Sequence, residues 1–424
     1  MGNHRNWASQ LDWRGPTAAF ALIGALLLAA FGTEPAQAQT YNVLYTFTGG
    51  TDGAFPAAAL IRDAAGNLYG TTEENNPYLC TALCGNVFKI DPGGKESTLH
   101  TFTDGKDGSG PSAGVVRDQA GNLYGTTQNG GSGAGSLGVV FKLSPTGKET
   151  ILHYFPKKPG DGEAPEGGVI LDSAGSLYGT TIQGGGGGCN FGCGTIFKID
   201  AADKETITSP FNGTVWAPTN LVRDAAGNFY GTTGLGGGTG CGGVGCGTVY
   251  KVDKAGKLTL LYAFHGAPDG NEPNGPVVFD KAGNLYGVTW EGGNTGPCPP
   301  SGCGTVYKID KTGKETVLHK FSLGDGFLPY GALVLDSKGN LYGTTFAGGA
   351  SCPVSGCGTV YKLDKKGKET VLYSFTGQTD GGFPLAGLVR DEAGNLYGTA
   401  YNGGYTRTGL CFPSGCGVVF KLTP

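Results

Sequence analysis

Short runs of apolar and aromatic residues follow one another along the chain after residue 40, separated by Gly, Asp, Pro and Lys-Gly turns. Four such runs make up one unit, for example residues 331–336 (GALVLD), 340–346 (NLYGTTF), 358–364 (GTVYKLD) and 368–375 (KETVLYSF). Runs of six to eight residues that are rich in Val, Thr and Tyr and bounded by turn residues predict β-strands. No stretch after residue 40 has the pattern of a long helix, so we expect an all-β protein.

The four-strand unit occurs seven times. Its N-[LF]-Y-G core (S-L-Y-G in one copy) recurs every 52–56 residues, with the glycine at Gly70, Gly125, Gly179, Gly231, Gly287, Gly343 and Gly398. Four strands in a unit of about 50 residues are typical of a β-propeller blade, so seven copies predict a seven-bladed β-propeller.

The motif DAAGNLYG (63–70) is interpreted as structural rather than catalytic, because it is repeated in every unit. Asp63 can accept hydrogen bonds from nearby backbone N–H groups and Gly66 can adopt a positive φ, which predicts a turn between the first and second strands. We expect Tyr69 to fill space between blades and Gly70 to leave room for the next sheet.

The two ends of the repeat region complement each other. Residues 41–47 (YNVLYTF) match the fourth strand of a unit, whereas the last unit stops at a third strand, GVVFKLTP. We therefore expect the N-terminal strand to complete the last blade and close the ring.

Residues 1–38 have the pattern of a secretory signal peptide, which leaves 39–424 as a single propeller domain. Arg5 and Arg14 precede an apolar run at 18–32, and Ala36-Gln37-Ala38 suits cleavage. An uncleaved membrane anchor is the alternative, but this run is shorter than the ~20 residues that a spanning helix needs. We expect an exported monomer, periplasmic or extracellular, with no membrane span after cleavage.

All cysteines stand in close pairs with three or four residues between them. Disulfides within the loops are indicated because the number is even and the chain is predicted to be exported. Zinc is the alternative, but it normally takes four ligands and no His stands beside a pair. In the second unit Leu137 stands where the later cysteine is expected. The pairs are Cys80/Cys84, Cys189/Cys193, Cys241/Cys246, Cys298/Cys303, Cys352/Cys357 and Cys411/Cys416.

Composition excludes some function classes. The 82 glycines stand at fixed places in the repeat, which argues against disorder, and the net charge of −4 without a basic run argues against binding to nucleic acid. No G-x-S-x-G, H-E-x-x-H or phosphate-loop motif is present, so no catalytic residue is predicted. Three histidines share a repeat position with tyrosines and are interpreted as strand packing; they are His100, His153 and His319.

The residue after each G-T-T (G-V-T or G-T-A in two copies) is the most informative variable position. Because this position reaches the loop face of a propeller, aromatic and acidic residues there suggest a site for a sugar or an aromatic ligand. The alternative is that these rings only cover neighbouring loops. The candidate ligand-binding residues are Trp290, Phe346, Tyr401 and Glu73, with Trp216 from the unusual loop of the fourth unit.

A second candidate is the aspartate of a D-G-x-x-P pattern that precedes most units. Six carboxylates at a channel mouth could hold Ca²⁺, although an Asp-Gly turn before a proline is the interpretation that we favour. No other cofactor is predicted. The aspartates are Asp52, Asp107, Asp161, Asp269, Asp325 and Asp380, with Asn212 in the remaining unit.

The motifs GCGTVYKID, GKETVLHKF, GDGFLPYGALVLD and GNLYGTT, all within 301–345, resemble the exported bacterial GloVer-type repeat proteins, also called choice-of-anchor repeat proteins. The resemblance covers essentially the whole predicted mature chain. It implies a propeller-like fold and export, and it supplies no catalytic residues. Two hypotheses follow: a non-catalytic propeller that binds a glycan or an envelope protein, or an enzyme acting on an extracellular polysaccharide with acidic residues at the channel mouth.

Overall fold

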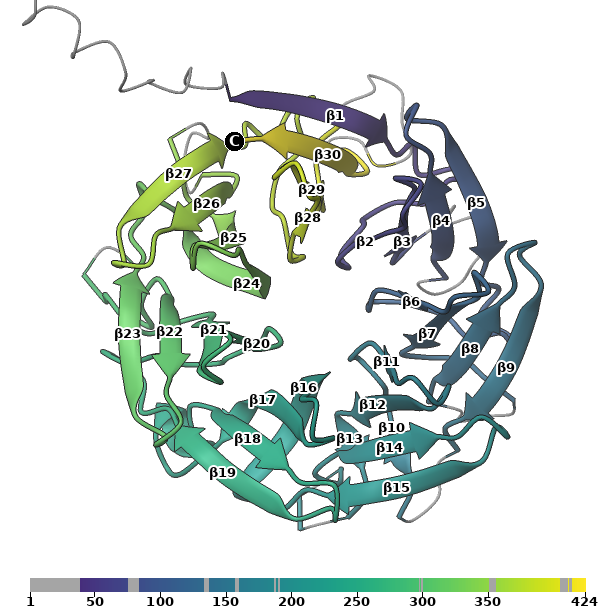
Figure 1. The fold of residues 1–424 in the computed structure, drawn as a ribbon, viewed down its shortest axis with the longest axis horizontal. Helices are drawn as coiled ribbons and strands as arrows, with labels where there is room; N and C mark the ends of the chain where they lie inside the picture. The colour runs from purple at the N-terminus through teal and green to yellow at the C-terminus, as the bar shows by residue number, and fades with distance from the viewer. Residues whose placement is uncertain are drawn as a thin grey trace, which may run out of the picture. The chain divides into compact units, whose positions relative to one another are not determined.

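The computed structural model of the chain describes residues 39–74, 84–132, 137–156, 160–186, 188–189, 191–296, 298, 300–350, 356–404, 411 and 414–424. Residues 39–424 form seven antiparallel four-stranded sheets, which stand as blades around one axis (Figure 1). In each blade the first strand lies nearest the axis and the fourth lies outermost. The predicted seven-bladed β-propeller is therefore confirmed.

The blades are numbered from the first complete unit. Blades 1 to 3 contain β2 (Ile61–Arg62), β3 (Leu68–Thr72), β4 (Asn86–Ile90) and β5 (Glu96–Thr101); β6 (Val116–Arg117), β7 (Leu123–Thr127), β8 (Val139–Leu143) and β9 (Glu149–Tyr154); and β11 (Ile170–Leu171), β12 (Leu177–Thr181), β14 (Thr195–Ile199) and β15 (Glu205–Pro210). Blades 4 and 5 contain β16 (Val215–Arg223), β17 (Phe229–Gly236), β18 (Thr248–Val252) and β19 (Leu258–Ala263); and β20 (Val278–Phe279), β21 (Leu285–Thr289), β22 (Thr305–Ile309) and β23 (Glu315–Lys320).

Blades 6 and 7 complete the ring. They contain β24 (Phe327–Leu335), β25 (Leu341–Ala347), β26 (Thr359–Leu363) and β27 (Glu369–Ser374); and β28 (Val389–Arg390), β29 (Leu396–Ala400), β30 (Val418–Thr423) and β1 (Thr40–Thr46). A small extra sheet pairs β10 (Gly162–Glu163) with β13 (Gln183–Gly184), and a 3₁₀ turn covers Cys241–Gly243. Within the described residues no helix is long and apolar enough to cross a bilayer. The predicted signal peptide, 1–38, lies outside them.

The ring closes through the N-terminal strand, as predicted. β1 pairs antiparallel with β30 over a register that runs from Thr40 opposite Thr423 to Thr46 opposite Val418. Figure 1 shows β1 outside β30, in the place of a fourth strand. Phe47, directly after β1, is 0% exposed and its ring centroid lies 5.1 Å from that of Phe88 in blade 1. Closure is thus made by ladder hydrogen bonds and by a core contact to the next blade.

The repeated DAAGN segment forms the predicted turn. The backbone N–H of Asn67 donates to Asp63 Oδ1 (2.9 Å), the Tyr69 hydroxyl donates to Asp63 Oδ2 (3.1 Å), and Gly66 has a φ of 88°. The same bonds, from an Asn backbone N–H and a Tyr hydroxyl, are accepted by Asp118, Asp224, Asp280, Asp336 and Asp391.

The apolar cores lie between neighbouring blades. Tyr69 of blade 1 packs in one of them with Phe141 of blade 2, as expected for a residue that fills space between blades. The expectation for Gly70 was wrong. A Cβ there would lie 2.6 Å from the Phe88 ring and 2.8 Å from Leu60, both in the same blade, so this glycine makes room for its own sheet's core.

Four disulfides are described, and each joins the two cysteines of one loop, as predicted: Cys189–Cys193, Cys241–Cys246, Cys298–Cys303 and Cys411–Cys416. Cys84 and Cys357 are also disulfide-bonded. Their predicted partners, Cys80 and Cys352, lie outside the described residues.

Candidate functional site

Each loop between the second and third strands is bonded to the next blade. The carbonyl of its second cysteine accepts a hydrogen bond from the backbone N–H of the residue before the D-G-x-x-P proline, as between Cys416 and Phe55 (2.9 Å). In blade 2, Leu137 takes the place of the cysteine and accepts from Ala164 (2.9 Å). The seven bonds span 2.7–3.2 Å, so the disulfide loops take part in joining the blades.

The residue before the proline has an unusual backbone. Six non-glycine residues there have φ between 53 and 59°, a region that L-residues rarely adopt, and Gly110 takes the place in blade 2. Because all seven blades share the geometry, it is a feature of the scaffold. The residue after the proline then enters the space at the axis. The six are Phe55, Ala164, Ala217, Glu272, Leu328 and Phe383.

An axial cavity of about 590 Å³ is the result. All seven blades contribute to its lining, and so do all seven residues that follow the proline. None of its described lining residues is Lys, Arg or His. The residues after the proline are Ala57, Ser112, Glu166, Thr219, Asn274, Tyr330 and Leu385.

Carboxylates occupy one side of this axial cavity. Glu73 of blade 1 and Glu166 of blade 3 both line it, and Gln128 of blade 2 donates from Nε2 to Glu166 Oε1 (2.6 Å). Burial raises the pKa of Glu73, against a lowering effect of its hydrogen bond with Tyr401, and the nearby charge of Glu166 adds to the increase. Burial also raises the pKa of Glu166. The axial cavity therefore presents two carboxyl groups that are weaker acids than an exposed glutamate.

Aromatic side chains lie beside the cavity, and Tyr330 is the one among its described lining residues. Tyr330 lines the cavity, and its ring lies edge-on to Trp290 with centroids 5.3 Å apart. Trp290 contacts Phe346 (5.6 Å), which in turn contacts Phe383 (5.2 Å). Further around the ring, the Tyr401 hydroxyl donates to Glu73 Oε2 (3.2 Å). We call the residues Tyr330, Trp290, Phe346, Phe383 and Tyr401 the aromatic arc.

The structure brings together most of the predicted ligand-binding residues. Trp290 contacts Phe346 and Tyr401 contacts Glu73, and each of the four is half-buried rather than fully exposed. Trp216 is separate, because it lines an outer groove of about 710 Å³ with the exposed Phe191. A smaller hollow of about 270 Å³ shares Glu166 with the axial cavity and Ile182 with the outer groove, so these depressions adjoin.

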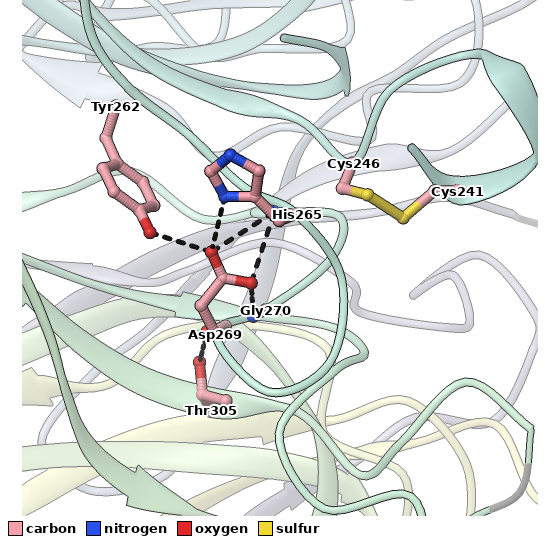
Figure 2. Close-up of polar contacts among 7 residues, drawn as sticks. All are labelled: Cys241, Cys246, Tyr262, His265, Asp269, Gly270 and Thr305. Atoms are coloured by element: carbon pink, nitrogen blue, oxygen red, sulfur yellow. Dashed lines mark hydrogen bonds and ion pairs between the residues drawn. A yellow bond between two sulfur atoms is a disulfide. The ribbon is translucent and has the colours of Figure 1, made fainter. Parts of the chain in front are cut away.

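The six aspartates of the D-G-x-x-P pattern are not among the residues that line the axial cavity. Asp269 lies in the loop between β19 and β20, and Figure 2 shows it with its hydrogen-bond partners and the nearby Cys241–Cys246 disulfide. The Tyr262 hydroxyl donates to Asp269 Oδ2 (2.8 Å), and the backbone N–H of Gly270 donates to Oδ1 (2.9 Å). This placement agrees with the turn interpretation. Calcium binding by these aspartates stays a prediction.

At most junctions between blades, a third residue lies beside the loop aspartate and its Tyr or His partner. This third residue comes from the fourth strand of the following blade. Glu315 of β23 lies near Asp269, whose charge adds to burial in raising the pKa of Glu315 to about 7. We call such a set a junction triad: a Tyr or His from one fourth strand, the loop Asp, and a Glu from the next fourth strand. Five are complete, namely Tyr45–Asp52–Glu96, His100–Asp107–Glu149, His153–Asp161–Glu205, Tyr262–Asp269–Glu315 and His319–Asp325–Glu369.

The other two junctions vary the triad. Between blades 6 and 7 Tyr41 replaces the glutamate, stacks on Tyr373 with centroids 3.9 Å apart, and donates to the Asp380 carbonyl oxygen (2.5 Å). Between blades 3 and 4 all three positions differ, being Ser209, Asn212 and Leu258.

Glu166 and Tyr330 were not predicted as site residues, although both line the cavity. Glu272, beside the smaller hollow, was also missed, and burial and the charge of Glu291 raise its pKa. A signal was present in the sequence. The residue after the proline varies between units as freely as the residue after G-T-T, and both positions meet at the axis.

Comparisons with known proteins match this architecture. A family model described as the Gloeobacter/Verrucomicrobia repeat matches residues 29–191 and 186–412. The structure of a streptogramin B lyase is similar with a TM-score of 0.57 and 13% identity, over 91% of this chain and 97% of that one. The extracellular domain of a protein described as a hybrid two-component system from B. thetaiotaomicron gives a TM-score of 0.50 and 13% identity, over 91% of this chain and 41% of that one. No curated protein sequence matches. At these identities the structural likeness shows the fold alone.

Proposed function

The chain belongs to the Gloeobacter/Verrucomicrobia repeat family, and from the geometry of its axial cavity we propose that it is an exported, non-catalytic binding protein whose ligand is a glycan. One observation carries the proposal: a single cavity is lined by carboxylate and amide groups and by Tyr330, whose ring contacts Trp290 of the aromatic arc. Sugars present hydroxyls to the first kind of surface and C–H faces to the second.

The charge of the lining narrows the class of glycan. Glu73 and Glu166 are acidic, and no Lys or Arg is among the described lining residues to balance them. An anionic polysaccharide would meet like charges in a partly desolvated space, which costs several kcal/mol. An uncharged or amino-bearing glycan avoids this repulsion, and an ammonium group would gain from the carboxylates and the arc.

Export is supported by the four described disulfides, because such bonds persist in oxidising compartments. We propose that the protein acts as a monomer, since each binding element comes from one ring.

A binding assay with three classes of oligosaccharide tests the function. Residues 39–424 should bind neutral or glucosamine-containing oligosaccharides and should not bind uronic-acid oligomers of the same length. Glu166→Gln and Trp290→Ala should each weaken binding at least about tenfold. Phe191→Ala is the matched control, because this exposed aromatic lies in the outer groove. Retention of the uronic-acid oligomers alone, or full affinity in both variants, would contradict the proposal.

A polysaccharide-cleaving enzyme is the second candidate, and one observation favours it. Glu73 and Glu166 share one cavity and burial raises the pKa of each, as a carboxylic acid that protonates a leaving group requires. The same oligosaccharides decide between the two functions. Release of new reducing ends by the wild type, abolished in Glu73→Gln and Glu166→Gln, indicates cleavage, whereas retention without release indicates binding.

A further inference from the structure

The junction triad between blades 2 and 3 has an arrangement of its own. His153 on β9, Asp161 in the next loop and Glu205 on β15 each place one donor atom within 4.8 Å of the other two. His153 Nε2 lies 3.3 Å from Glu205 Oε1. Within the described ranges, no other group of three His, Cys, Asp or Glu residues meets this spacing.

The equivalent triad between blades 5 and 6 is closed by its own hydrogen bonds. His319 Nε2 bonds to Asp325 Oδ2 (3.0 Å), while the backbone N–H and hydroxyl of Ser322 donate to Oδ1 (2.7 and 2.9 Å). In contrast, His153 Nε2 is buried and has no hydrogen-bond partner among the described residues, a state that it shares with His100 Nε2 between blades 1 and 2. A buried ring nitrogen left in this state is unfavourable unless another group satisfies it.

The same junction lacks a disulfide loop. At the other six junctions the carbonyl that binds the next blade belongs to a cysteine, but here it belongs to Leu137. The one junction without a cysteine pair is therefore the one with the close His–Asp–Glu set. This coincidence is independent of the donor geometry: the loop keeps its backbone bond to blade 3 through Leu137 but has no disulfide to brace it.

We propose that His153, Asp161 and Glu205 bind a divalent transition-metal ion, with Zn²⁺ the best match, which joins blade 2 to blade 3. One imidazole and two carboxylates supply three ligands of a tetrahedral site, and water can supply the fourth. Ca²⁺ is disfavoured because it takes six to eight oxygen ligands.

Titration of chelator-treated residues 39–424 with ZnCl₂ in a calorimeter tests the proposal. We expect one Zn²⁺ per chain and a melting temperature about 3 °C higher at a Zn²⁺ concentration of about 100 times the Kd. CaCl₂ should give neither signal. His153→Tyr copies the residue found at Tyr45, Tyr262 and Tyr373, so the fold should accept it, and it should weaken Zn²⁺ binding at least about 100-fold. His319→Tyr, the matched change at a closed triad, should leave binding unchanged.

Glu205→Gln, which keeps the shape of the side chain, gives a second measurement if His153→Tyr fails to fold. It should lose the Zn²⁺-dependent rise in melting temperature. A wild type that binds no stoichiometric Zn²⁺ would overturn the proposal. So would a Zn²⁺ affinity that survives Glu205→Gln, because the ion would then lie elsewhere.

Discussion

Truncation of the aromatic side chain of Phe47, which directly follows the closing strand β1, should destabilise the propeller. Phe47 is 0% exposed, follows β1 directly and packs edge-on against Phe88 of blade 1. Truncation of a buried Phe to Ala typically costs about 3–5 kcal/mol, because the transfer free energy is lost and a cavity remains. With an unfolding entropy of about 2.1 cal/mol/K per residue, residues 39–424 would then melt about 4–6 °C lower.

Differential scanning fluorimetry and urea denaturation of residues 39–424 would measure this cost. Phe375, which is 0% exposed at the equivalent position of blade 6, is the positive control, and Phe375→Ala should cost a similar amount. Val43→Ala is the mild control, because Val43 of β1 is 37% exposed, and it should cost less than about 1 kcal/mol. If the melting temperature of Phe47→Ala equals that of Val43→Ala and lies well above that of Phe375→Ala, the claim that β1 belongs to the folded ring is refuted.

Three further predictions concern the arc, the junctions and the loops. Trp290→Ala should weaken glycan binding while lowering the melting temperature by only about 1–2 °C, since the ring is half-buried; a drop as large as that of Phe375→Ala would make it a packing residue. The pKa values of Glu149, Glu315 and Glu369 are raised by burial to about 7, so the folded state holds protons that the unfolded state has released above pH ~4.5. Stability from these groups is therefore present below pH ~4.5 and is lost as the pH rises through 7. The difference between the melting temperatures at pH 5 and pH 8 should be smaller in Glu315→Gln than in the wild type. Peptide mapping without reduction should link Cys84 to Cys80 and Cys357 to Cys352, and any link between blades would contradict the loop assignment.

The fold could be predicted from the sequence because its signals are local. The glycine of N-[LF]-Y-G marks each unit, and the orphan fourth strand at 41–47 needs a partner that only the last unit offers. Closure followed from counting strands. The role of Gly70 could not be deduced in this way, because the clash with Phe88 depends on which face of the sheet each side chain takes.

The candidate site was only half predictable for a related reason. Trp290, Phe346, Tyr401 and Glu73 follow a motif, so their shared position was visible, whereas Glu166 reaches the axis only because the backbone turns at a positive φ one residue before the proline. No feature of the sequence indicates in which direction the six aspartates of the D-G-x-x-P pattern point. A loop carboxylate can face the axis or a neighbouring blade, and pairing with the next blade's glutamate is a contact between units that no single repeat displays.

The strand that closes the ring is also made long before its partner. Thr40 pairs with Thr423, so β1 leaves the ribosome 383 residues before its partner in β30. Blades 1 to 6 consist of consecutive strands and can form in order, whereas the seventh must wait until β30 has been made. At about 5–20 residues per second, the unpaired strand is exposed for about 20–80 s. During this interval β1 has no ladder partner, and a circular permutant with β1 moved behind β30 would abolish the wait.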